Sequence, residues 1–181
     1  MKRIKKFEIQ NYIPEYRDGL KGIHFEDQKA IVTDGHYLIA LQNLYPESME
    51  NITLNKNFTV WNSDYKFPNW KRVIPDISKG YHGYDIDVKD LSLCYKLKGN
   101  SILFKDSEKK LGYVSPYVLD VMIEFMNYFK ISNIYIPDDM HSAWKVEAYN
   151  TENFMILMPR FEEEFIPYEY DINRNSLTIF Q

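Results

Sequence analysis

The chain has 181 residues, 45% of them hydrophobic and 16% aromatic, which is enough to bury a core and excludes a disordered tail. The formal net charge of −4 excludes the general basic character typical of nucleic-acid-binding domains. Cys94 is the only cysteine, so an intramolecular disulfide is excluded. With no signal peptide recognisable and no apolar run near the roughly 18 residues of a membrane span, we expect a cytoplasmic protein.

The first half of the chain predicts short strands with little helix. Six segments are β-like in their alternation and residue types: Arg3–Ile9, Gly22–Asp27, Ala30–Val32, Tyr37–Leu41, Ile52–Leu54 and Phe58–Trp61. Asp34-Gly35 lies between two of them, which is a strong signal for a tight turn. Asn11–Lys21 is expected to be a loop, and Asn43–Asp76 a long connection across the surface.

The second half adds two predicted helices. In Ser115–Phe129, Ser115 suits the N-cap and Pro116 the first helical position. Its apolar stripe comprises Val118, Val121, Met122, Phe125 and Phe129, and its polar face comprises Asp120, Glu124 and Asn127. Val88–Leu97 is the second helix, with Asp87 as its N-cap and Gly99 near its end.

Further strands follow these helices or lie between them. The predicted ranges are Tyr84–Asp87, Ser101–Lys105, Asn133–Ile136, Ala143–Ala148 and Phe154–Phe161. Many strands with about two helices inserted between strand groups predict an α+β fold with antiparallel sheets.

The residues that usually carry catalysis form no recognisable motif. The four histidines (His24, His36, His82 and His141) lack metal-ligand spacing, and phosphate-binding, dinucleotide-binding and Gly-x-Ser-x-Gly motifs are absent. Cys94 lies among leucines in a predicted helix and is expected to be a buried, inert thiol. Asp138-Asp139 is explained better by a turn than by acid–base chemistry. We therefore expect no cofactor, no metal and no enzymatic activity.

Five segments, in the same order along the chain, resemble motifs of one known family. They are Leu20–Phe25 (L-x-G-x-x-F), Thr33–Leu38 (T-D-G-H-R-L), Phe67–Pro75 (F-P-x-Y-R-R-V-L-P), Ser115–Val121 (S-Y-V-L-D-V) and Ile156–Phe161 (V-V-M-P-M-R). The family is the bacterial DNA sliding clamp, the β subunit of DNA polymerase III. The nine-residue segment that starts at Phe67 is the most specific of the five.

The resemblance implies a shortened, clamp-like unit. Residues 1–76 resemble half of the clamp's middle domain with a linker, and residues 81–161 resemble a shortened last domain. Together 1–161 would form one compact domain, followed by a tail or hairpin over 162–181.

The matched segments also imply a hydrophobic pocket that docks linear peptide motifs of replication or repair proteins, such as Gln-Leu-Ser/Asp-Leu-Phe. Carried over residue by residue, the pocket comprises Leu20, Thr33, Gly35, His36, Leu38, Pro68, Arg72, Val73, Tyr117, Ile156, Met158 and Pro159. Tyr37 stands where the family has an arginine, and Arg160 where it has a methionine. The expected partners are a DNA polymerase or other clamp-binding proteins with a Leu/Phe-containing motif.

Two alternatives to peptide docking stay open on the sequence alone. One is a structural or regulatory oligomer that keeps the clamp fold but has lost the pocket. The other is an enzyme, which the absence of a catalytic constellation disfavours. Duplex DNA is expected to bind weakly, because Asp120 and Glu124 occupy the polar face of the clearest helix.

The end of the chain allows two interpretations. Tyr168–Ile172 and Ser176–Phe180 alternate like the strands of a hairpin around Asn173-Arg174-Asn175. Ser176–Phe180 also resembles the peptide that clamps capture, with Ser176 in place of glutamine, so the tail could instead occupy the pocket.

Overall fold

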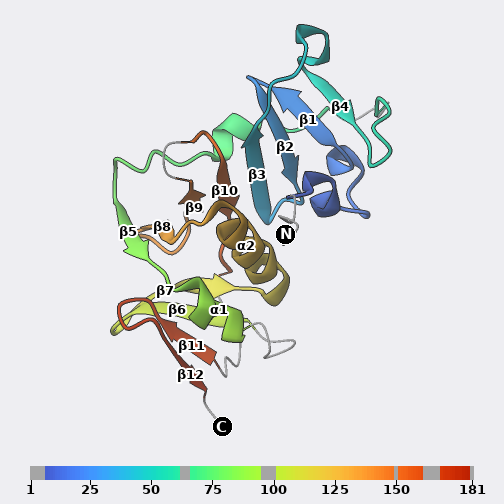
Figure 1. Ribbon diagram of the computed structural model, residues 1–181. Coiled ribbons are helices and arrows are strands. Elements are labelled where there is room, and N and C mark those ends of the chain that lie inside the picture. Colours follow the sequence, from blue (N-terminus) through green and yellow to red (C-terminus); the bar gives the residue numbers. More distant parts are fainter. Residues whose placement is uncertain (1–6, 62–65, 95–100, 149–150, 161–167, 180–181) are drawn as a thin grey trace.

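The strands form two sheets, seen in a computed structural model that describes residues 7–61, 66–94, 101–148, 151–160 and 168–179 (Figure 1). The larger sheet has the order β4 (Ile52–Leu54), β1 (Ile23–Glu26), β2 (Lys29–Thr33), β3 (Tyr37–Gln42), β10 (Phe154–Leu157), β9 (Trp144–Glu147), β8 (Asn133–Pro137) and β5 (Tyr81–Asp85). The smaller has the order β12 (Ser176–Ile179), β11 (Tyr168–Asp171), β6 (Ile102–Asp106) and β7 (Lys109–Val114). All neighbours are antiparallel except β11 and β6. The expected α+β class with antiparallel sheets is confirmed.

The predicted turn at Asp34-Gly35 joins β2 to β3. Gly35 has a φ of +89°, a conformation that side chains disfavour. The Asp34 Oδ1 atom accepts hydrogen bonds from the backbone N–H groups of His36 (2.7 Å) and Tyr37 (2.9 Å). These bonds fix the register in which β3 leaves the turn.

A seam between β3 and β10 joins the two halves of the chain into one sheet. Leu38 lies opposite Ile156, and Ala40 lies opposite Phe154. Because side chains alternate along a strand, these four residues lie on one face of the sheet, while their neighbours, such as Ile39 and Met155, lie on the other.

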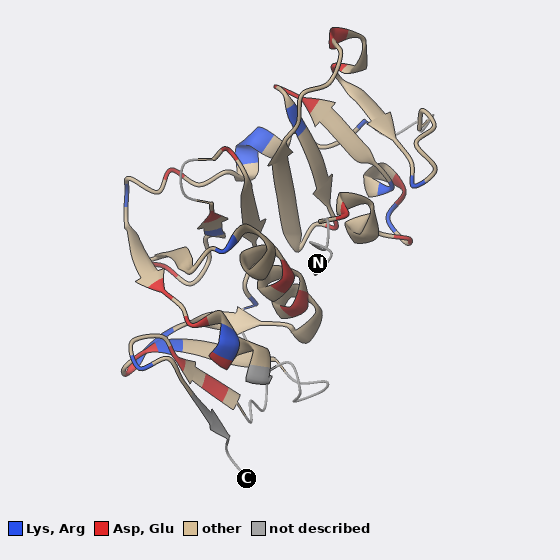
Figure 2. Cartoon of the chain, viewed as in Figure 1, with Lys and Arg blue, Asp and Glu red and all other residues tan. Residues whose placement is uncertain are grey.

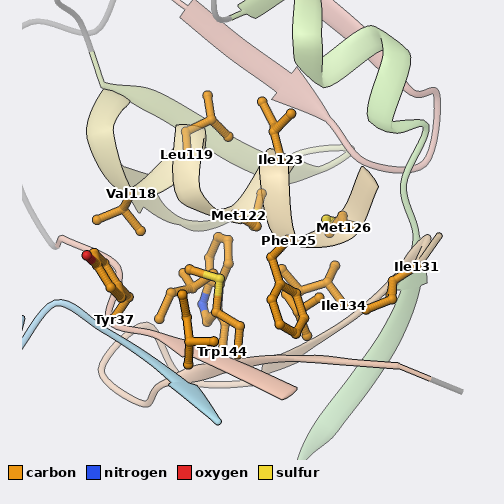
Figure 3. Close-up of a cluster of buried hydrophobic side chains, with 14 of the residues drawn as sticks. Tyr37, Val118, Leu119, Met122, Ile123, Phe125, Met126, Ile131, Ile134 and Trp144 are labelled. Atoms are coloured by element: carbon orange, nitrogen blue, oxygen red, sulfur yellow. The ribbon is translucent and has the colours of Figure 1, made fainter. Parts of the chain in front are cut away.

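Helix α2 (Pro116–Phe129) covers the inner face of the larger sheet. Pro116 occupies the first helical position as predicted, and the helix ends at Phe129, which is followed by Lys130 in a left-handed conformation. Figure 3 shows Val118, Met122 and Phe125 directed from the helix towards the cluster that contains Trp144. The predicted apolar stripe is therefore the buried face, although Val121 and Phe129 are only partly buried.

Among the described residues, the segment Phe67–Ile74 covers part of the outer face of the same sheet. This segment contains a short 3₁₀ helix, Trp70–Val73. Trp70 is buried against a small cluster that includes Ile31, Leu38 and Ile156. The outer cover is thus much smaller than the inner one.

Several predicted boundaries need correction. Ile9 begins a 3₁₀ helix (Ile9–Tyr12), so the strand predicted to reach it is wrong there, and residues 1–6 of that prediction lie outside the described part. Phe58–Trp61 is not a strand, because only Val60 forms a bridge, with Leu54. The strand β7 was not predicted, and β10 ends at Leu157 instead of Phe161.

The second predicted helix and the predicted hairpin are both present. Helix α1 spans Val88–Cys94, and the Asp87 side chain accepts a hydrogen bond from the Lys89 N–H (2.8 Å). Residues 95–97 of the predicted helix, Gly99 and the Cys94 side chain lie outside the described part of the chain. The tail forms the hairpin: β12 pairs with β11 in the smaller sheet, on the other side of α2 from the larger one (Figure 1).

Candidate functional site

An apolar cavity of about 260 Å³ opens at the seam, on the outer face of the larger sheet. Its walls come from four parts of the chain that are distant in sequence and meet beside the β2–β3 turn. The lining residues are Leu20, Thr33, Gly35, His36, Tyr37, Leu38, Pro68, Asn69, Trp70, Val73, Ile156 and Met158.

The sheet provides the floor of the cavity and the segment Phe67–Ile74 provides one wall. Leu38 and Ile156, which face each other across the seam, are buried. Trp70 is only 4% exposed, whereas Val73 (46%) and Met158 (38%) are open to solvent. The cavity therefore has a closed apolar interior and an apolar, accessible mouth.

The turn after β2 forms the opposite side of the mouth. The His36 carbonyl accepts a hydrogen bond from the Met158 N–H (2.8 Å), which ties the turn to the residue that follows β10. The Arg17 Nη2 and His36 Nε2 atoms are 3.2 Å apart, and the Tyr117 ring meets the His36 ring edge-on, with centroids 6.0 Å apart. This side adds polar groups to a cavity lining that is mostly apolar.

The two tyrosines near the turn are neutral at physiological pH. Burial, and next the negative charge of Asp34, raise the pKa of both Tyr37 and Tyr117 well above the ordinary value. The Tyr37 hydroxyl donates a hydrogen bond to the Tyr12 carbonyl (3.0 Å), away from the outer face. Neither phenol therefore adds a negative charge beside the cavity.

The structure brings together nine of the twelve residues that the sequence predicted for the pocket. Those lining the cavity are Leu20, Thr33, Gly35, His36, Leu38, Pro68, Val73, Ile156 and Met158. The other three do not line it. Arg72 is exposed beside Val73. Tyr117 contacts the ring of His36, which lines the cavity, and Pro159 is buried against Gly112 of β7.

Three lining residues, Tyr37, Asn69 and Trp70, were missed by the sequence prediction. Each lies inside a matched segment, and Trp70 stands at the position of the family's tyrosine in the segment that starts at Phe67. Treating that segment as one continuous wall would have found Asn69 and Trp70.

Other polar groups have structural explanations. Asp139 accepts hydrogen bonds from the N–H groups of His141 and Ser142 (2.7 and 2.8 Å), as expected of a turn. The Asp138 carboxylate lies 2.9 Å from His82 and 3.2 Å from Lys109 on the surface. Over the described ranges, no group of His, Cys, Asp and Glu side chains could hold a metal ion, and no helix is long and apolar enough to cross a membrane.

Comparison with known proteins gives matches in structure alone. No protein-family model and no curated protein matches the sequence. A sliding clamp of Bartonella birtlesii solved with griselimycin superposes with a TM-score of 0.60 at 14% identity, covering 84% of this chain and 62% of the other. The Helicobacter pylori β clamp, solved with 3,4-difluorobenzamide, gives 0.60 at 14% identity, covering 85% and 62%.

The β subunit of DNA polymerase III from Thermotoga maritima is similar to the same degree, with a TM-score of 0.57 at 12% identity, covering 82% of this chain and 59% of that one. The chain thus spans about three fifths of the length of the clamps it matches. The order of strands, the two helices and these superpositions agree: the chain has the fold of a bacterial DNA sliding clamp, in shortened form.

Proposed function

We propose that this protein is a non-catalytic, clamp-like binding protein that docks linear peptide motifs of DNA replication or repair proteins. The observation that carries the proposal is the open apolar cavity at the β3–β10 seam, in a chain with the sliding-clamp fold. The ligand is a short peptide with Leu and Phe anchors, held by the apolar interior.

The physical chemistry of the cavity fits such a ligand. Burying one Leu or Phe side chain contributes roughly 1.5–3 kcal/mol to the free energy of binding, and a second anchor in the same cavity adds a similar contribution. Met158 at the mouth is unbranched and can adapt to different side chains. His36, Arg17 and Tyr117 can contact the polar backbone of the peptide at the opposite rim.

The alternative of an oligomer that has lost the pocket is less well supported. Such a protein would be expected to fill the cavity with its own side chains, since apolar sheet surface is normally buried within the fold. Here Val73 and Met158 remain open to solvent, and the tail pairs in the other sheet. A homo-oligomer with functional pockets is compatible with the proposal.

The proposal is tested by titrating the protein into a fluorescein-labelled peptide containing Gln-Leu-Ser-Leu-Phe and following fluorescence anisotropy. Met158→Ala should weaken binding by about 1–3 kcal/mol, as for the loss of a partly buried apolar anchor contact. Leu44→Ala is the matched control, because Leu44 is 87% exposed and does not line the cavity.

Two outcomes count against peptide docking. If the wild type does not bind the peptide, the cavity has no such role. If Met158→Ala and Leu44→Ala bind as tightly as the wild type, the peptide binds elsewhere.

A further inference from the structure

The wall of the cavity formed by Phe67–Ile74 is attached to the sheet by side chains. Among the described residues, its backbone hydrogen bonds are local, from the Arg72 N–H to the Asn69 carbonyl (3.2 Å) and from Ile74 to Lys71 (3.4 Å). The position of this wall, and with it the width of the cavity, therefore depends on side-chain contacts with neighbouring strands.

Glu26, at the end of β1, makes the most direct of these contacts. Its Oε2 atom accepts a hydrogen bond from Trp70 Nε1 (2.5 Å), and its Oε1 atom lies 2.8 Å from Lys71 Nζ. Lys71 also pairs with Asp27 at 2.6 Å. One carboxylate thus holds two consecutive residues of the wall, one of which lines the cavity.

His24 supports the same arrangement from two residues earlier on the same face of β1. Its ring stacks on Phe67, with centroids 4.5 Å apart and planes at 11°. Its Nδ1 atom lies 3.0 Å from Thr53 Oγ1, and its Nε2 atom lies 3.5 Å from Glu26 Oε2. His24 and Glu26 therefore support the start and the middle of the wall from one strand.

The Glu26 carboxylate is ionised at physiological pH. Burial acts to raise its pKa, but the hydrogen bonds from Lys71 and Trp70 outweigh this effect and leave the pKa below the ordinary value. Hydrogen bonds to a charged acceptor are stronger and shorter than neutral ones, which suits a fixed anchor for the indole.

We propose that Glu26 is a positioning residue for the peptide pocket: it does not touch the ligand but holds the Trp70 indole where the ligand needs a wall. Glu26 does not line the cavity, and Trp70 does. The inference rests on the proposed function for its ligand, but the Glu26–Trp70 contact can be tested without a ligand.

Three substitutions of Glu26, tested in the same anisotropy titration, separate the position of its side-chain oxygen from its negative charge. Glu26→Ala leaves the indole N–H without its acceptor and should weaken binding about tenfold. Glu26→Gln keeps an oxygen at the same reach and should weaken it by less than about threefold. Glu26→Asp keeps the charge but withdraws the carboxylate by one methylene, and should be weaker than Glu26→Gln.

The control is Glu169→Ala, in the smaller sheet. The Glu169 side chain is 22% exposed and pairs with Lys105 at 2.7 Å, whereas that of Glu26 is 24% exposed and pairs with Lys71. Glu169→Ala should leave affinity unchanged. In a Trp70→Phe background, Glu26→Ala should change affinity by less than about twofold, because its target N–H is gone.

A ligand-free measurement tests the contact itself. In a Trp61→Phe background the remaining indoles are Trp70 and Trp144, and Trp144 is fully buried. Acrylamide should quench the fluorescence more strongly in Glu26→Ala than in Glu26→Gln, because the wall carrying Trp70 loosens.

The outcomes distinguish the two proposals. If the wild type binds peptide and Glu26→Ala binds equally well, or if Glu26→Asp binds better than Glu26→Gln, the positioning role is overturned while docking stands. If the wild type does not bind peptide, docking fails; quenching that increases in Glu26→Ala then still supports the hold on Trp70, and unchanged quenching overturns it.

Discussion

The two faces of the larger sheet are both apolar but are covered very differently. On the inner face, α2 and the segment from Phe7 to Ile13 cover a continuous core in which Phe125, Met155 and Trp144 are fully buried. On the outer face, Phe67–Ile74 covers only part of the surface, and Met158 stays 38% exposed.

This difference separates stability from binding. A closed apolar face contributes to folding, because its side chains are removed from water in the free protein. On a face that is left partly open, some apolar surface stays in water in the free protein and would be buried only when a ligand binds. Exposed apolar surface of this kind commonly marks an interaction site. Substitutions on the inner face should therefore lower stability and leave peptide affinity unchanged, whereas substitutions on the outer face should lower peptide affinity with little loss of stability.

The largest effect is expected from Phe125→Ala on the inner face. Phe125 contacts Phe7 (5.8 Å between ring centroids) and Phe129 (4.8 Å), and its truncation should lower the free energy of unfolding by about 3–5 kcal/mol. Urea denaturation measures the loss. The remaining folded protein should bind the peptide normally.

Met158→Ala provides the contrast to Phe125→Ala, with a loss of stability below about 1 kcal/mol and a clear loss of affinity. Equal losses of stability in Phe125→Ala and Met158→Ala would remove the distinction between the two faces.

Removal of β12 is expected to have the next largest effect. Deleting Asn175 to Gln181 also removes the Asn175 side chain, which accepts hydrogen bonds from the Asp87 N–H (2.9 Å) and the Tyr170 hydroxyl (2.7 Å). We expect a loss of about 2 kcal/mol or more in stability and no change in peptide affinity. An increase in affinity on deletion would show that the tail competes for the pocket after all.

A smaller effect is expected from the protonation of His24 behind the outer wall. Burial lowers the pKa of His24 below its ordinary value of 6.5; the negative charges of Glu26 and Glu50 oppose this shift, and the charge of Lys71 adds to it. The unfolded chain therefore takes up a proton at His24 at higher pH than the folded protein does.

The free energy of unfolding should consequently fall as the pH drops below 6.5, through the range between the two pKa values. Urea unfolding of the wild type and of His24→Gln from about pH 7.5 to 5.5 checks this. The slope should be shallower in His24→Gln, and identical slopes would exclude His24 as its source.

The smallest signal is expected for duplex DNA. Figure 2 shows acidic residues on α2. The acidic residues of this helix are Asp120, which is partly buried, and Glu124, which is exposed. DNA binding is driven by basic side chains that neutralise phosphates and release counterions, whereas acidic side chains repel the phosphates. The isolated chain should therefore bind with a Kd no tighter than about 10⁻⁴–10⁻⁶ M at physiological salt. A nanomolar, salt-sensitive affinity in a filter-binding assay would contradict this.

Elements specified by local chemistry were predictable from the sequence. The β2–β3 hairpin follows from Asp34-Gly35, and α2 follows from Ser115-Pro116 and its apolar stripe. The strand β7 was missed because it begins with two lysines and contains Gly112, and both residue types are depleted in strands. It exists because β6 pairs with it and because Pro159 and Trp144 pack closely on Gly112.

The candidate site was predictable as a set of segments but less so as a surface. Nine lining residues follow from the motif resemblance. Pro159 was assigned to the pocket by its match to the family's motif, yet its side chain is buried against Gly112 of β7 and does not line the cavity. The direction of a side chain at the end of a strand depends on tertiary packing, which a local motif does not encode.

The seam also has a consequence for the order of events during synthesis. Leu38 and Ile156, the two halves of the cavity floor, are joined by strand pairing between distant parts of the chain. Contacts of such large sequence separation form late, because the loop between them must first be closed. A growing polypeptide therefore lacks this cavity until β10 has left the ribosome and paired with β3.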